Sequence, residues 1–295
     1  MFRISKKAEN YRTQFYENYD ITNWFSMFSM YVWERLKFYH EGSKFSSKVD
    51  EPLFTHDLIQ GISQIIKEDK IPIPVRLFHS RKESANGNDI EIIVQIQKDK
   101  NIIFPCQAKR LYVENANATY KQLNYKEGEQ KQKLIKYAKS INGFPLYLLY
   151  NYSEHNFDTK YLFSEKELYG CTLLSAQYLD ENPNLKLIVS KLHPPAKPLI
   201  SILKFRDILS LNRVWGVLKS EHGAEPWSDE EILKDDRWNE FGPPSYLPTR
   251  FVSSTDWEKV FTKQTSQIVA NQLFNPKFRI ILTHDVIDLN TRKIS

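Results

Sequence analysis

The sequence predicts an α/β (α+β) protein with a mixed central sheet flanked by helices, an N-terminal helical layer and a C-terminal extension. Three observations predict this fold. The chain opens on an aromatic-rich segment with helical spacing, two alternating runs meet near residue 99 like a β-hairpin, and a helix then leads to a short apolar run. We divide the chain into a helical region (1–50), a core (51–152) and a C-terminal region packed on or extending that core (153–295).

The composition is that of a globular and mildly basic protein. Hydrophobic residues make up 41% of the chain, and the net charge of +5 permits a polyanionic partner. Its two cysteines form no CxxC pair, which argues against a disulfide framework and a structural zinc site. Neither GxxxxGK nor GxGxxG occurs, which argues against a glycine-built nucleotide cradle. We expect a cytoplasmic protein without a membrane partner, because no signal-peptide core and no apolar run of membrane-spanning length occurs.

The N-terminal segment from about Glu9 to His40 has aromatic residues near helical spacing, which predicts helix. Asp20 or Thr22 could cap a break within it. We interpret the aromatic side chains as a helical layer packed on the core, in preference to a surface on which nucleic-acid bases stack. The polar, serine-rich residues 42–50 have the composition of a linker.

A second helix is predicted after Pro52, with an apolar stripe formed by Leu58, Ile59, Ile62, Ile65 and Ile66. Glu51 stands at its entrance, either as a partner of the helix dipole or as an acid aimed into a site over the sheet. A strand over 71–79 and a loop over 80–88 follow, and Glu83 lies on that loop.

The two alternating runs form the most informative part of the chain. From Asp89 to Gln97 polar and apolar residues alternate, and the run from Ile102 to Lys109 alternates in the same way after a polar turn. If the runs pair antiparallel about residue 99, Asp89 faces Lys109 and Glu91 faces Gln107. These four polar residues then share one face, while the apolar residues of both runs share the other.

A helix is predicted from about Glu127 to Ile141, followed by a buried strand over Pro145–Tyr150. A strand, a crossover helix and a second strand imply a parallel pair with a right-handed connection. The expected sheet therefore has three antiparallel strands and then a parallel one. Gln130 and Gln132 lie on the crossover helix, where an amide could reach a phosphate, although an exposed glutamine is the default interpretation.

The C-terminal third has weaker patterns. We predict a helix over 168–179, a short strand over 186–192 and a final strand over Phe278–Leu282. Two candidate capping boxes open further helices, Ser228 with Glu231 and Thr255 with Glu258. Nothing in this region indicates a particular chemistry.

The polar face of the hairpin has the residue types that phosphodiester hydrolysis needs. A divalent cation held by oxygen ligands can activate water and stabilise charge on phosphorus. Asp89 is the natural first ligand, and Gln107 offers a carbonyl oxygen without negative charge. That deficit calls for another acid, and three are available: Glu91, Glu83 and Glu51. Lys109 could orient the attacking water or neutralise the developing charge.

The same residues also have a structural interpretation. Asp89 and Lys109 could form a cross-strand ion pair, which contributes little stability on an exposed surface. Glu91 could belong to a solvated strand face, and Glu83 could be an ordinary loop charge.

The arrangement Asp89 … Gln107-Ala108-Lys109, with Glu51 on the preceding helix and a crossover helix after it, resembles the PD-(D/E)xK nuclease superfamily in its D…QxK (Mrr-like) variant. The block from Glu83 to Asn151 also resembles an uncharacterised bacterial family thought to share this core. The resemblance covers residues from about 50 to 152. It implies a restriction-endonuclease-like core, a Mg²⁺ or Mn²⁺ site and action on nucleic acid. Gln107 stands where most members of the superfamily carry an acid.

Three functions follow as hypotheses. The first is a Mg²⁺-dependent endonuclease acting on nucleic acid, with DNA favoured over RNA, and with a role in bacterial anti-phage defence by analogy. Its nucleic-acid contacts would be Arg110, Gln130 and Gln132, and it leaves open a homodimer or a defence-system partner. The second is a catalytically inactive nuclease-fold module that binds nucleic acid or a partner. The third is an interaction protein built on the aromatic N-terminal helix, without salt-dependent nucleic-acid binding.

Overall fold

The computed structural model describes the residues 5–41, 51–67, 75–80, 89–97, 100–114, 117–120, 123, 128–152, 165–181, 197–199, 228–235, 238–240 and 277–282. The side chains of Glu51 and Asp89 are not among the described features, although their backbone is. Glu83, the predicted strand over 186–192, the pair Thr255 and Glu258 and the linker 42–50 lie outside the described residues.

The N-terminal segment forms two helices, α1 (Lys6–Asn18) and α2 (Ile21–Glu41), so the predicted break near Asp20 is confirmed. Tyr19 ends α1 in the left-handed conformation, with φ of 52°, and its N–H donates to Phe15 O. The side chain of Asp20 then accepts a hydrogen bond of 2.8 Å from the N–H of Thr22. Two local hydrogen bonds therefore stabilise the turn between the helices.

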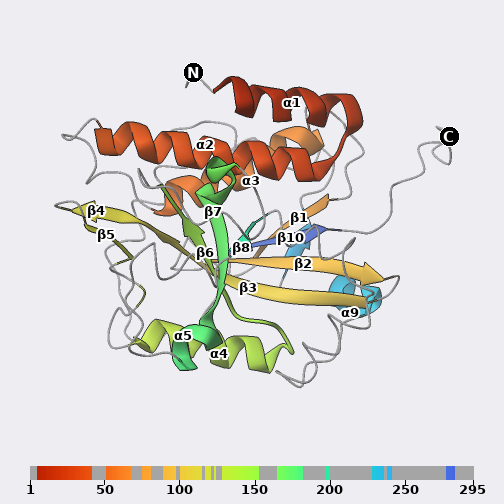
Figure 1. The fold of residues 1–295 in the computed structure, drawn as a ribbon. Helices are drawn as coiled ribbons and strands as arrows, with labels where there is room; N and C mark the ends of the chain where they lie inside the picture. Colours follow the sequence, from red (N-terminus) through yellow and green to blue (C-terminus); the bar gives the residue numbers. More distant parts are fainter. Residues whose placement is uncertain are drawn as a thin grey trace, which may run out of the picture.

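Helix α3 (Glu51–Lys67) completes this helical layer. Figure 1 shows α1, α2 and α3 on one side of the sheet, with α4 (Glu129–Ser140) and α5 (Ala176–Glu181) on the other. A hydrogen bond of 2.9 Å joins Thr55 Oγ1 of α3 to the hydroxyl of Tyr150 in the sheet. Within the described residues, no helix is long and apolar enough to cross a membrane.

The central sheet is mixed, as predicted, and the described residues give it eight strands in the order β8-β7-β6-β3-β2-β10-β1-β9. The strands are β1 (Val75–Ser80), β2 (Asp89–Gln97), β3 (Lys100–Arg110), β6 (Leu146–Tyr150), β7 (Cys171–Ser175), β8 (Lys197–Pro198), β9 (Trp238–Glu240) and β10 (Phe278–Leu282). A separate antiparallel pair is formed by β4 (Tyr112–Glu114) and β5 (Asn117–Thr119). The parallel pairing of β6 with β3 confirms the predicted crossover through α4.

The predicted run of three antiparallel strands is wrong in one respect. The final strand β10 lies between β1 and β2, antiparallel to the first and parallel to the second. All five residues of β10 are buried, which is typical of a central strand covered on both faces. The C-terminal region therefore supplies an interior strand of the core sheet.

The predicted helix over 168–179 is also wrong. This stretch contains a short 3₁₀ helix η4 (Lys166–Gly170), then β7, and only then the short helix α5. Four of the five residues of β7 are buried. A short apolar run that is covered on both faces has no periodicity that separates a strand from a buried helix, and this explains the error.

Each face of the sheet packs against different elements. Ile90, Ile92 and Val94 of β2 belong to the large core that includes the apolar residues of α1, α2 and α3. The alternate residue Ile93 belongs to a smaller cluster with Ile103, Ile141 and Ile232, against which Tyr137 of α4 packs. The polar residues Glu91, Gln107 and Lys109 share the parity of this second, α4-side face.

Candidate functional site

The register of β2 and β3 differs from the prediction by two residues. Asp89 is paired with Gln107, and Glu91 is paired with Pro105, in place of Lys109 and Gln107. The ladder has an irregularity between Gln95 and Gln97, so the turn is not centred on residue 99. A shift of two residues retains side-chain parity, and the prediction of a shared polar face therefore holds.

Gln107 is the residue of this face whose side-chain hydrogen bonding is incomplete among the described residues. Its side chain is buried, with the residue only 5% exposed, and Oε1 accepts no hydrogen bond within the described part of the chain. A buried carbonyl oxygen without a donor costs about 1 to 3 kcal/mol. Such an atom calls for an explanation, and a bound ion or water is one.

Lys109 lies two residues further along β3 and is also buried, with 6% exposure. Its Nζ donates a hydrogen bond of 3.0 Å to Oε1 of Gln130, which comes from the second residue of α4. The structure therefore brings together two of the predicted residues, Lys109 and Gln130. Gln132 donates to Asp180 of α5 and takes no part in this contact.

Helix α4 can reach the sheet at two points because of its sequence. Leu134 and Ala138 are buried, and they fix the side of the helix that faces the protein. Gln130 and Tyr137 are two helical turns apart and lie on one side of α4. Gln130 contacts Lys109, and the hydroxyl of Tyr137 donates to Oε1 of Glu91.

Glu91 is fully buried, and both of its oxygens have partners in the chain. Oε2 accepts from Nε of Arg279 at 2.9 Å and lies 2.8 Å from Nη2 of the same residue. Arg279 belongs to β10 and is the direct neighbour of Glu91 in the parallel ladder. Nη2 of Arg279 also donates to Asp235 Oδ2 at 2.7 Å. We call Glu91, Arg279, Asp235 and Tyr137 the buried charge cluster.

Sequence reasoning missed Arg279 and Asp235. The signal was present, because Arg279 is the one charged residue in the otherwise apolar run Phe278–Leu282. A charge within a fully buried strand needs a buried partner of opposite sign. Glu91, a single acid between apolar neighbours on β2, is the matching residue.

Arg110 lies apart from the polar face, because it has the opposite parity to Lys109 along β3. It is 2% exposed, and its guanidinium carbon lies 4.1 Å from the centre of the Tyr112 ring. Burial, and then the charge of Arg110, lowers the pKa of His40 on α2 to about 4. Arg110 is thus an interior cation next to the helical layer, and its buried position gives nucleic acid no exposed guanidinium to contact.

The described residues contain no group of three or more His, Cys, Asp or Glu side chains able to hold a metal ion. This statement does not reach the predicted ligands Asp89 and Glu51, whose side chains lie outside the described features, or Glu83. The backbone places Asp89 directly across from Gln107, and α3 begins at Glu51. Of the residues predicted to hold the metal, the structure describes the side chains of Gln107 and of Glu91, and Glu91 is already paired with Arg279.

The chain matches a protein family whose function is unknown. A model described as a family of unknown function (DUF6615) matches residues 22–285, from the start of α2 to just beyond β10. No curated protein and no solved structure matches the chain.

Proposed function

We propose that this chain, which belongs to the family of unknown function DUF6615, is a metal-dependent endonuclease with a preference for DNA over RNA. One observation carries the proposal. The buried oxygen of Gln107 accepts no hydrogen bond from the described residues, stands in register with Asp89, and lies two residues from the buried ammonium of Lys109. A carboxylate, an amide oxygen and an ammonium on one strand pair are the groups that a hydrolytic magnesium site uses.

The residues fit a hard divalent cation, Mg²⁺ or Mn²⁺, because such ions prefer carboxylate and carbonyl oxygens. Asp89 and Gln107 would hold it. When bound, the ion would supply a water of lowered pKa and stabilisation of charge on the phosphate. Gln107 is neutral, so the site needs a second acid beside Asp89. Glu91 is already ion-paired with Arg279 and hydrogen-bonded to Tyr137, so Glu51 or Glu83 would supply that acid.

Lys109 would stabilise the negative charge that develops on the phosphate oxygens or hold the attacking water. Its hydrogen bond to Gln130 fixes the ammonium against α4 before any substrate arrives. Gln130 would therefore act as a positioning residue for Lys109. A preformed arrangement of this kind lowers the reorganisation that the reaction requires.

A polyanionic substrate agrees with the net charge of +5. The preference for DNA and the role in anti-phage defence come from the resemblance to Mrr-like nucleases, and we carry them as analogy. Salt dependence of binding would report the number of phosphates that the protein neutralises.

Cleavage assays test the proposal directly. Supercoiled plasmid, single-stranded DNA and RNA are incubated with Mg²⁺, with Mn²⁺ and with EDTA. We expect metal-dependent plasmid nicking that falls by about 100-fold or more in Lys109→Met and in Asp89→Asn. Lys136→Met is the matched control, because Lys136 is an exposed lysine of α4, and it should cleave as the wild type does. Equal cleavage by all three variants would contradict the proposal.

A second candidate is a nuclease-fold module that binds nucleic acid or a protein partner without cutting. The specific observation in its favour is the buried charge cluster, which uses both oxygens of Glu91 and leaves a neutral Gln107 on the polar face. Such a module would bind nucleic acid in EDTA with a normal salt dependence and would show no turnover with either metal.

A further inference from the structure

A pocket of about 380 Å³ lies between α1, α2 and α3, in the helical layer on the side of the sheet away from α4. This volume is within the range of small-molecule sites. One wall is aromatic and includes Tyr16, Trp24 and Tyr31. Helix α3 contributes the polar residues Asp57, Gln60 and Gln64 to the lining. An aromatic lining with a few polar groups is typical of a site for a small organic ligand.

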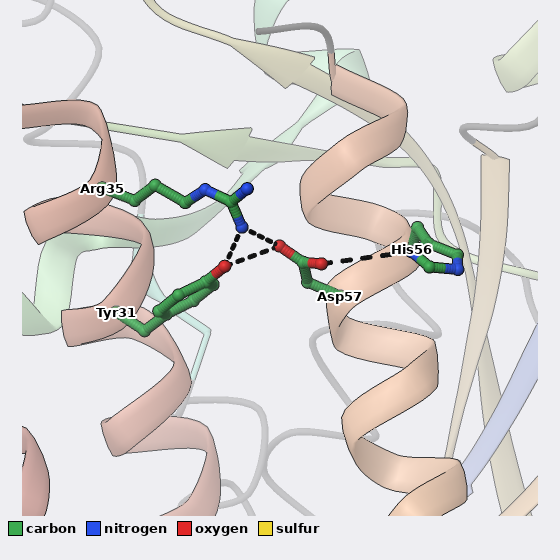
Figure 2. Close-up of polar contacts among 4 residues, drawn as sticks. All are labelled: Tyr31, Arg35, His56 and Asp57. Atoms are coloured by element: carbon green, nitrogen blue, oxygen red, sulfur yellow. Dashed lines mark hydrogen bonds and ion pairs between the residues drawn. The ribbon is translucent and has the colours of Figure 1, made fainter. Parts of the chain in front are cut away.

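Asp57 is the partly buried acid of this pocket, and Figure 2 shows how α2 holds it. Its Oδ2 accepts from the hydroxyl of Tyr31 at 2.8 Å and from Nη1 of Arg35 at 2.5 Å. The other oxygen, Oδ1, has His56 Nδ1 at 4.0 Å, beyond hydrogen-bond distance. Within the described residues, Oδ1 therefore keeps its capacity to accept from a ligand.

The aromatic wall packs closely against α3. A Cβ added to Gly61 would lie 2.7 Å from Cζ2 of Trp24, so glycine allows the indole to lie against α3. Trp24 also stacks on Phe28, with ring centres 5.6 Å apart and an angle of 6° between the planes. Trp24 and Phe28 are only 4% and 3% exposed and form the closed base of this wall, whereas Tyr16, at 42%, is open to a planar ligand.

The acidic and the basic side chain of the pocket differ in solvent exposure. The side chain of Asp57 is 21% exposed, whereas that of Arg12 is 44% exposed. Arg12 lies above the ring of Tyr16 at 6.0 Å and is 3.6 Å from Glu9, a surface pair of small energy. A complementary ligand would carry N–H donors at its inner end and an anion at its outer end.

We propose that this pocket binds a purine mononucleotide. The base would stack on Tyr16, the exposed ring of the aromatic wall, with its N–H groups directed to Asp57 Oδ1 and to the amides of Gln60 and Gln64. The phosphate would meet the guanidinium of Arg12, a geometry that arginine recognises well. Guanine matches the acid best, because its edge carries adjacent N–H donors. The site is separate from the polar face of the sheet, so it does not depend on the proposed nuclease activity.

Isothermal titration in EDTA tests the proposal with GMP, AMP, UMP, guanosine and inorganic phosphate as probes. We expect saturable binding of GMP or AMP that is stronger than that of UMP and of phosphate alone. Tyr16→Ser should weaken binding by about tenfold, the loss of one stacking contact. Tyr19→Ser is the matched control, because Tyr16 and Tyr19 are both 42% exposed and only Tyr16 lines the pocket. Arg12→Ala should weaken the binding of GMP and leave the binding of guanosine unchanged.

A Lys109→Met variant tests on which side of the sheet the nucleotide binds, because Lys109 lies on the α4-side face. It should bind GMP with the affinity of the wild type even if it has lost all cleavage. Three results would each overturn the proposal: no saturable binding of any purine nucleotide, equal loss in Tyr16→Ser and Tyr19→Ser, or phosphate that binds as tightly as GMP.

Discussion

Replacement of Arg279 by methionine should destabilise the fold more than any other single loss of charge among the described ion pairs. The guanidinium and the Glu91 carboxylate are essentially inaccessible, with side-chain exposures of 1% and 0%. Asp235, the other acid bound by Arg279, is 6% exposed. Arg279→Met leaves two carboxylates in the interior without their cation.

The size of the effect follows from this burial. Removal of one partner of a buried ion pair costs about 3 to 5 kcal/mol, because the remaining charge is left uncompensated. Glu91→Gln should cost less, about 1 to 2 kcal/mol, since the amide oxygen can still accept from Arg279 or Tyr137 and Asp235 still neutralises the guanidinium. The prediction that Arg279→Met loses more stability than Glu91→Gln is therefore firmer than either energy value.

Urea unfolding followed by circular dichroism measures both variants. Lys234→Met is the control, because Lys234 forms an ion pair with Glu230 in which the side chains are 73% and 71% exposed. Its loss should change the free energy of unfolding by less than about 1 kcal/mol. If Arg279→Met is no more costly than Lys234→Met, the reasoning from burial is refuted.

Two further predictions concern the helical layer. Burial, with Arg110 as a second cause, lowers the pKa of His40 to about 4, below its unfolded value near 6.5. The unfolded chain therefore takes up this proton first, and stability is lost as the pH falls from about 6.5 to 4. Urea unfolding at pH 7 and pH 4.5 measures this loss of stability in the wild type and in His40→Gln. After allowance for the partial exposure of His40, the variant should lose about 1 to 2 kcal/mol less than the wild type. Equal losses in the two proteins would contradict the assignment to His40. Gly170→Ala should cost about 3 kcal/mol in thermal unfolding, because its Cβ would lie 1.9 Å from Ser29 O of α2. In Gly143→Ala the closest contact of the new Cβ would be 3.0 Å, to Ile103 O, so this variant should lose clearly less stability than Gly170→Ala. Equal losses in the two variants would show that η4 can move away from α2 at little cost.

Local patterns predicted those parts of the fold that depend on local sequence. The alternation from Asp89 to Gln97 gave the correct faces, because side-chain parity does not depend on what a strand pairs with. The break near Asp20 and the capping box of Ser228 with Glu231 were also predicted, since each is formed by residues within one turn.

The pairing of distant segments could not be predicted in this way. The strand β10 was recognised as a strand, but nothing in its five residues indicates that it separates β1 from β2. Glu91 consequently seemed available to a metal ion, whereas the structure pairs it with Arg279. The register of β2 and β3 failed for a related reason, because an irregular turn shifts a ladder without changing the composition of either strand.

The proposed site depends most directly on the oxygen of Gln107, so the decisive measurement is a Mn²⁺ titration of the wild type and of Gln107→Leu. Leucine has a similar size and removes the amide, which within the described residues accepts no hydrogen bond at Oε1. We predict that the wild type binds one Mn²⁺ ion tightly enough to raise its melting temperature, and that Gln107→Leu keeps its fold and loses this binding. Equal Mn²⁺ binding by the two proteins, or none by the wild type, would contradict a metal centre at Gln107.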